Sequence, residues 1–157
     1  MTSVAGVSLG HRDLAVADHW IRSLDPAPEL ACTHLVTVPF RHVAISLVTS
    51  SAYETEPALA PAASAAAEGR NGRAVLFDGS AGLVGTLAVG DVLAGSAIDR
   101  VEVLGGGAAP PETLLDTRDF VRPQVRDGEL VLTTTPAAGG LLIPFEVRNP
   151  TPCCAGH

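Results

Sequence analysis

The chain has 157 residues, and 46% of them are hydrophobic, which excludes a disordered polymer and suffices for one folded domain. The formal net charge of −7 disfavours binding to nucleic acid or to an anionic membrane surface. All 10 basic residues are arginine, so catalysis through a lysine Schiff base is excluded. The sequence shows no signal-peptide pattern and no apolar run of membrane-spanning length, so we expect a cytoplasmic protein with free thiols.

The first 25 residues predict a short loose segment followed by a helix. We expect residues 1–10 to be a frayed start. From residue 13 to residue 24, apolar side chains recur at helical spacing, which predicts an amphipathic helix. Its inward positions are Leu14, Ala17, Trp20, Ile21 and Leu24, and its outward positions are Asp18, Arg22 and Asp25.

The next segments predict a β-hairpin and a second helix. Residues 31–38 and 42–50 are rich in β-branched residues and are separated by a short turn segment. Residues 54–69 form an Ala-rich helix, which Pro61 restricts to the part that follows it. If this helix connects 42–50 to 73–77 as a crossover, the sheet is mixed rather than purely antiparallel.

After Gly72, short β-like runs alternate with glycine and proline. The predicted strands are 74–77, 83–89, 98–104, 114–121, 129–135 and 141–147. Asp127-Gly128 is the strongest hairpin signal, because both residues tolerate the positive φ of a type I′ turn. The fold prediction is a single α+β domain over residues 1–157, mainly antiparallel β as a small barrel or sandwich, with one N-terminal amphipathic helix and one Ala-rich helix.

All three cysteines lie close to a histidine in the sequence. Cys32 precedes His34 by two residues, so the two share one strand face, and the chain ends in Cys153-Cys154-Ala155-Gly156-His157. Thiolate and imidazole are the usual protein ligands of zinc and of other thiophilic metals. If the tail at 149–157 folds back, the sequence predicts one Zn²⁺ site whose ligands are Cys32, His34, Cys153, Cys154 and His157.

The predicted metal has two open roles. Four protein ligands make it structural, and three ligands with an open position permit metal-assisted hydrolysis. We expect His42 to lie outside this site. A hairpin that turns at residues 39–41 places His34 opposite Ser46, and His42 then lies about 13 Å further along the strand.

Two other functions remain open at this point. One is a non-enzymatic module that binds a small apolar ligand or a second copy of the chain. The other is an enzyme that uses Cys32 as its nucleophile. The charged run at 112–122 is interpreted as a solvent-exposed edge strand on which Asp116, Arg118 and Phe120 share a face.

Overall fold

The structure is a computed structural model that describes residues 3–68 and 71–148. The chain divides into two compact units where the sequence analysis expected one domain. The first unit is Met1–Asp78 with Pro123–Leu130, and the second is Gly79–Arg122 with Val131–His157. Each unit is described by itself.

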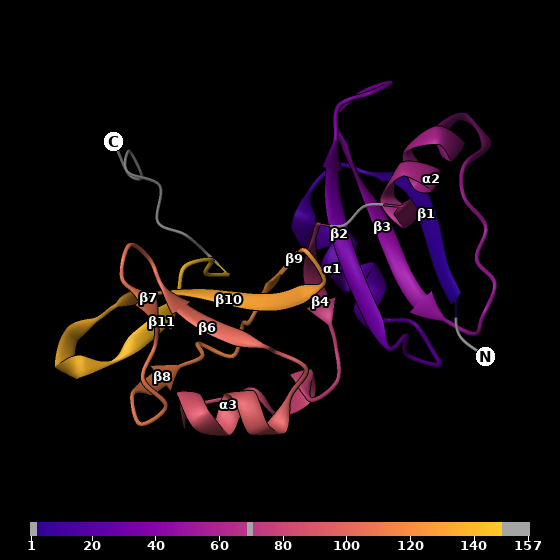
Figure 1. Ribbon diagram of the computed structural model, residues 1–157. Coiled ribbons are helices and arrows are strands. Elements are labelled where there is room, and N and C mark those ends of the chain that lie inside the picture. Colours follow the sequence, from indigo (N-terminus) through magenta and orange to yellow (C-terminus); the bar gives the residue numbers. More distant parts are fainter. Residues whose placement is uncertain (1–2, 69–70, 149–157) are drawn as a thin grey trace. The chain divides into compact units, whose positions relative to one another are not determined.

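The first unit is an antiparallel sheet with two helices (Figure 1). Its strands are β1 (Ser3–His11), β2 (Leu30–Val36), β3 (His42–Thr49), β4 (Gly72–Leu76) and β9 (Gln124–Arg126). Their order is β1-β3-β2-β4-β9, and each neighbouring pair is antiparallel. The helices are α1 (Leu14–Arg22) and α2 (Ala60–Glu68), and a 3-10 turn, η1 (Pro57–Leu59), precedes α2. The predicted helices and hairpin are therefore confirmed.

The two helices of the first unit cover opposite faces of its sheet. The connection β1-α1-β2 passes over β3, and the connection β3-α2-β4 passes over β2. Both connections move two strands in the same direction across the sheet, but they start from strands β1 and β3, which run in opposite directions. Because crossover connections are right-handed, α1 and α2 therefore lie on opposite faces of the sheet. The expected crossover around α2 is thus present, with β2 lying between its two strands.

The face under α1 is the hydrophobic core of the first unit. Ala17 and Ile21 of α1 are fully buried against Val7, Ile45 and Leu47 of the sheet. On the other face, α2 approaches so closely that a Cβ added to Gly6 would overlap the carbonyl oxygen of Ala63. A residue larger than glycine at position 6 would therefore push α2 away from β1.

The helix α1 forms as its sequence predicts, except at one position. Asp13 caps the helix by accepting a hydrogen bond of 2.8 Å from the Val16 amide. Asp18 was expected to face solvent, but it is buried and receives hydrogen bonds of 2.7 and 2.9 Å from the two terminal nitrogens of Arg73 in β4. Helical periodicity places Asp18 at the edge of the apolar face, and only its partner on β4 makes burial tolerable.

The prediction of a frayed start was wrong for residues 3–10. They belong to β1, which pairs with β3 from the Ser3–Thr49 pair to the His11–Val43 pair. Ala5 and Val7 point toward α1 because alternate residues of a strand face the same side. This period-two pattern is present from Ala5 to Ser8, but the exposed apolar residues Val4 and Leu9 on either side interrupt it.

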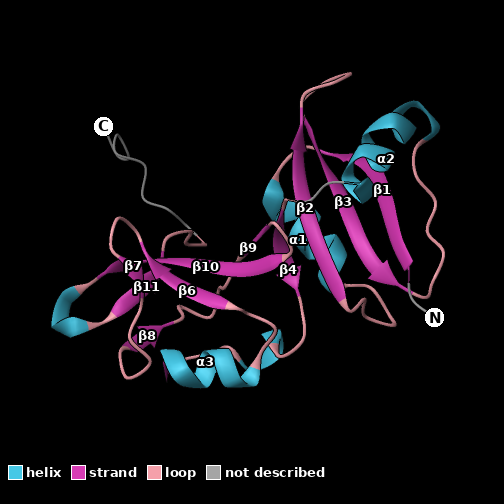
Figure 2. Ribbon diagram, viewed as in Figure 1, coloured by secondary structure: helices cyan, strands magenta, loops and turns pink. Residues whose placement is uncertain are grey.

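The second unit is also built on an open set of strands (Figure 2). Its strands are β5 (Thr86–Ala88), β6 (Arg100–Val103), β7 (Gly107–Ala108), β8 (Leu114–Asp116), β10 (Glu129–Pro136) and β11 (Leu142–Pro144). The strand β10 begins in the first unit and belongs to the second unit from Val131. The 3-10 turns of this unit are η2 (Ser80–Gly82) and η3 (Ala138–Gly140), and its helix is α3 (Val89–Gly95).

The strand order in the second unit is β7-β6-β10-β11-β8-β5, with two parallel pairs, β6–β10 and β8–β11. The α+β class with mainly antiparallel strands is confirmed. The small barrel or sandwich is not confirmed, because the path of the described strands has two free ends. Asp127 and Gly128 have φ values of 49° and 83° between β9 and β10, so the positive φ expected for this hairpin turn is confirmed.

Four predicted strands of the second unit have only three or four residues each in the structure: 83–89, 98–104, 114–121 and 141–147. The segment 83–89 contains only the short β5, and α3 follows it at once. Gly90-Asp91 was interpreted as a break between strands, but it lies within α3. This helix buries Val89 and Val92, which are one helical turn apart. The segment 114–121 is a strand only at β8, since Arg118 and Asp119 have φ values of 56° and 52° and turn the chain.

Candidate functional site

The α2-facing side of the first unit's sheet carries a cluster of polar side chains. Cys32 and His34 come from β2, and Ser46 comes from β3, where it pairs with Cys32 on one side and with Gly6 on the other. Gly6 lies directly under α2. Because residues paired across an antiparallel ladder point to the same face, the three side chains lie on the α2-facing side. We call Cys32, His34 and Ser46 the polar cluster.

His34 is held by hydrogen bonds on both sides of its ring. Its Nε2 lies 2.8 Å from the hydroxyl of Ser46, and a further hydrogen bond joins the ring to the backbone of Asn71. Burial lowers the pKa of His34, and the bond to Asn71 acts in the opposite direction. That effect requires the Asn71 carbonyl to accept a ring N–H. The Ser46 hydroxyl at Nε2 and the Asn71 backbone therefore fix the orientation of the His34 ring.

Cys32 is almost completely buried, with an exposed fraction of 2%. Burial raises the pKa of its thiol to about 12, and a hydrogen bond with Ser46 only partly opposes this effect. The thiol is therefore protonated at neutral pH. A metal ion that binds here must displace this proton, which makes its affinity depend on pH.

Cys32 and His34 converge over a glycine. A Cβ added to Gly72 would lie 2.9 Å from both Cys32 Cβ and His34 Cε1, and 3.3 Å from the Cys32 sulfur. The sulfur and the imidazole therefore approach one common point above β4. Any side chain at position 72 would occupy that point.

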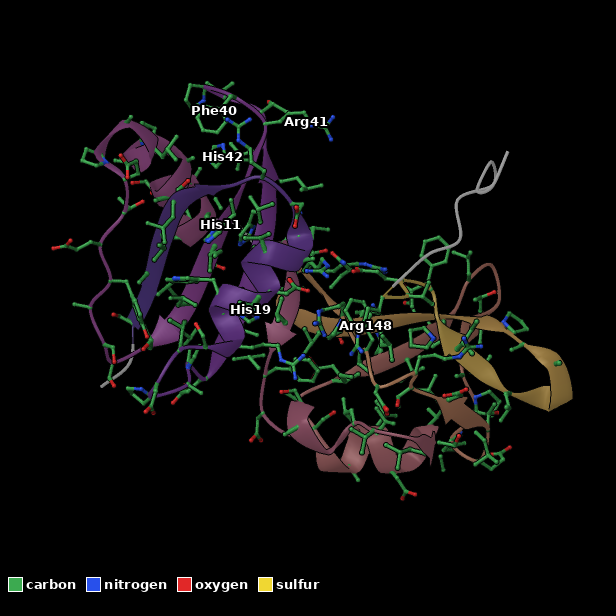
Figure 3. All side chains as sticks on the ribbon, turned by 180° about the vertical axis from the view of Figure 1, so that it is seen from behind. His11, His19, Phe40, Arg41, His42 and Arg148 are labelled. Atoms are coloured by element: carbon green, nitrogen blue, oxygen red, sulfur yellow. The ribbon has the colours of Figure 1, made fainter. Side chains whose placement is uncertain are left out.

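His42 begins β3, two residues before Ala44, which pairs with His34. The assumed register was wrong, because β2 and β3 pair His34 with Ala44 and Val36 with His42, so His42 is closer to His34 than expected. Its ring instead contacts Phe40 at a centroid distance of 5.0 Å (Figure 3). Its Nδ1 lies 2.8 Å from the Phe40 carbonyl oxygen, whereas the His34 ring engages Ser46.

The structure brings together two of the five predicted ligands, Cys32 and His34. Cys153, Cys154 and His157 lie outside the described residues. Within residues 3–68 and 71–148, no group of three or more His, Cys, Asp or Glu side chains is arranged to hold a metal ion. A complete site built on Cys32 and His34 therefore needs donors from beyond these ranges.

A cavity of about 330 Å³ opens beside the polar cluster. The end of β2 and the loop that follows it form one wall, from His34 to Val38, and α2 forms the other wall with Ala62, Ala65 and Ala66. Its lining is mainly apolar, and the His34 side chain is the one titratable group among these residues. The space exists because alanine side chains are too short to fill it.

Ser46 was expected opposite His34 but was not named as a site residue. The signal that could have revealed it is the hairpin register, because pairing Cys32 with Ser46 brings the hydroxyl beside both the thiol and the imidazole. The alternation of apolar and polar residues alone does not fix this register, because the register depends on whether the hairpin loop has three residues or five.

The charged run at 112–122 forms a turn rather than a strand face. Asp116 and Arg118 make an exposed ion pair at 3.2 Å, and Asp116 also accepts a hydrogen bond from the Arg118 amide. Phe120 is nearly buried, and the Arg122 guanidinium lies 4.0 Å from its ring centroid. These contacts stabilise the local chain direction.

Comparison with protein-family models, with curated proteins and with solved structures yields no significant match to this chain. In the part of the chain that the structure describes, no helix has the length and apolar character needed to cross a membrane.

Proposed function

We propose that the protein binds a thiophilic transition metal, with Zn²⁺ as the first candidate, and that Cys32 and His34 are two of its ligands. The observation that carries this proposal is the convergence of the Cys32 sulfur and the His34 ring above Gly72. Thiolate and imidazole together suit zinc and softer metals better than they suit calcium or magnesium.

The hydrogen bonds of His34 match those of a metal-binding histidine. The hydrogen bond to the Asn71 backbone orients the ring, which is what the outer contact of a metal-binding histidine usually does. Ser46 Oγ lies 2.8 Å from Nε2 and so marks the direction in which a metal would approach this nitrogen. In this proposal a metal replaces the Ser46 hydrogen bond at Nε2.

The remaining ligands in the proposal are Cys153, Cys154 and His157. Two or more of them complete a tetrahedral shell and make the metal structural, whereas one leaves a position open for water. A location in a reducing compartment, such as the cytoplasm, belongs to the same proposal, because unpaired thiols persist there. The net charge of −7 supports expecting no nucleic-acid partner.

Metal content of the protein purified without an affinity tag tests this function. After loading with Zn²⁺ and desalting, the proposal predicts a stoichiometric metal-to-chain ratio by elemental analysis. Cys32→Ser and His34→Gln each lower that ratio, and so does Cys153→Ser. Protein that retains no zinc after desalting contradicts the proposal.

His42→Gln is the matched control for His34→Gln, because His42 lies on the same hairpin but outside the polar cluster. Its zinc content stays at the wild-type value. If Cys153→Ser abolishes binding while Cys32→Ser and His34→Gln do not, the metal belongs to the tail alone and the proposed site is wrong.

The cavity beside α2 favours a second candidate, the binding of a small apolar ligand. Its volume of about 330 Å³ falls at the lower end of the range for ligand sites, and alanines line one wall. Ala65→Leu would fill part of it. Loss of binding of a small apolar fluorescent dye in this variant, with zinc content unchanged, favours this candidate over the metal site.

A Cys32 nucleophile is the function that the geometry supports least. Reactive cysteines have a lowered pKa and access to solvent, whereas Cys32 has a raised pKa and is buried.

A further inference from the structure

A buried ion pair lies behind the polar cluster, on the other face of the same sheet. Asp18 of α1 and Arg73 of β4 form it, and α1 packs against β4 (Figure 1). The Arg73 guanidinium also lies 3.2 Å from the hydroxyl of Thr33 in β2. Thr33 stands between Cys32 and His34 in the strand, so its side chain points to the opposite face. We call Asp18, Arg73 and Thr33 the buried ionic network.

Arg73 directly follows the two residues that contact the predicted ligands. The backbone of Asn71 is hydrogen-bonded to the His34 ring. Gly72 lies under both ligands, since a Cβ added there would be 2.9 Å from Cys32 Cβ and from His34 Cε1. Gly72 has no side chain that could hold its own position. The placement of residues 71–72 against β2 therefore depends on the anchored side chain of Arg73.

The pairing of β2 with β4 is irregular next to the polar cluster. The register shifts by one residue between Ala31 and Cys32. A shift of this kind leaves one residue of the longer strand unpaired and disrupts the ladder locally. Thr33 and Arg73 form the next pair along this ladder, and their side chains are in contact. This contact fixes the register at the point where the ladder itself is weakened.

We infer that the buried ionic network is the positioning element of the proposed metal site: it holds residues 71–73 in register with β2, so that the two ligands of that strand meet above Gly72. The inference rests on the proposed function, and the members of the network touch no metal in it. Outer contacts that orient metal ligands typically contribute about 10- to 100-fold to metal affinity.

Direction, more than stability, distinguishes this network from apolar packing. A buried ion pair is often no more stabilising than apolar side chains of similar size. A bidentate contact between a guanidinium and a carboxylate fixes the relative orientation of both groups, which apolar packing leaves less defined. Replacing the charges by apolar side chains is therefore expected to keep the fold and to loosen the placement of residues 71–73.

The double variant Asp18→Leu with Arg73→Met tests the inference. Zinc affinity is measured by competition with a chromophoric chelator, and urea denaturation confirms that the variant is folded. The variant is expected to bind Zn²⁺ about 10- to 100-fold more weakly than the wild type. In metal-free protein, NMR is expected to show weaker cross-strand contacts between His34 and residues 71–72, which a purely stabilising role of the network would not change.

Thr33→Val is a milder second variant, because it removes the hydroxyl that links Arg73 to β2 and leaves the ion pair in place. It is expected to weaken zinc binding by less than the double variant does. Asp116→Asn with Arg118→Gln is the matched control, since it removes one charge of each sign from an exposed ion pair in the second unit. Its zinc affinity stays at the wild-type value.

The outcomes separate this inference from the proposed function. Wild-type zinc affinity and unchanged His34 contacts, in every variant of the network that folds, overturn the inference and leave the proposed function in place. A wild-type protein that binds no zinc contradicts the proposed function. The NMR comparison of metal-free proteins then still decides whether the network positions His34.

Discussion

Replacing Asp18 by alanine removes one partner of a buried ion pair in the first unit. Asp18 and Arg73 form a bidentate contact with N–O distances of 2.7 and 2.9 Å, and each side chain is only 9% exposed. The Arg73 guanidinium also lies 3.2 Å from the Thr33 hydroxyl. Asp18→Ala leaves a buried cation without its carboxylate, which costs about 3–5 kcal/mol of unfolding free energy.

Urea denaturation followed by Trp20 fluorescence measures this loss, because Trp20 packs against the core of the first unit and is the one tryptophan in the chain. Arg22→Ala is the control on the same helix, since Arg22 is exposed and its loss changes stability by less than about 0.5 kcal/mol.

The double variant Asp18→Leu with Arg73→Met separates pairing from packing. Replacing both charges by apolar side chains of similar size is expected to leave stability within about 2 kcal/mol of wild type. If Asp18→Ala lowers the unfolding free energy no more than Arg22→Ala does, the Asp18–Arg73 ion pair does not contribute as a buried pair and this prediction is refuted.

Three further predictions concern the first unit. Gly6→Ala destabilises it by about 2–4 kcal/mol in the same urea assay, because the new Cβ overlaps the backbone of Ala63. Cys32 reacts slowly with iodoacetamide at pH 8 in metal-free protein and rapidly in urea, as peptide mapping will show, since burial raises its pKa to about 12. Burial also lowers the pKa of His11 below 6.5, and its ring lies 5.8 Å from Trp20, so a pH titration of Trp20 fluorescence has its midpoint below 6.5.

The glycine and histidine predictions each have a control variant. Gly82→Ala should change the unfolding free energy little, because nothing lies within 4 Å of a Cβ at that position. His19→Gln leaves the Trp20 titration unchanged, whereas His11→Gln removes it. Because the folded protein disfavours the protonated form of His11, its contribution destabilises the fold as pH falls below about 6.5, and His11→Gln makes stability less dependent on pH there. A midpoint at or above 6.5, or fast alkylation of folded Cys32, contradicts the described burial.

Local patterns sufficed to predict the elements that depend on near neighbours. The spacing of Leu14, Ala17 and Ile21 predicts α1, because helical contacts join residues three and four apart. The turn at Asp127-Gly128 was predictable for the same reason, since backbone conformation there depends on residue type.

Features that depend on distant partners could not be predicted in this way. The burial of Asp18 depends on Arg73, which is 55 residues away. The position of Ser46 beside Cys32 and His34 depends on a hairpin register that a two-residue difference in loop length changes. The shared strand face of Cys32 and His34 was predictable, because it depends only on the two-residue repeat.

X-ray absorption spectroscopy of the zinc-loaded protein tests the proposed metal site most directly, because it counts sulfur and nitrogen ligands around the metal. The account predicts a mixed shell with Zn–S distances of about 2.3 Å and Zn–N distances of about 2.0–2.1 Å. Cys32→Ser loses one sulfur from that shell, and His34→Gln loses one nitrogen. A shell of oxygen and nitrogen alone, or one that is identical in wild type and Cys32→Ser, contradicts it.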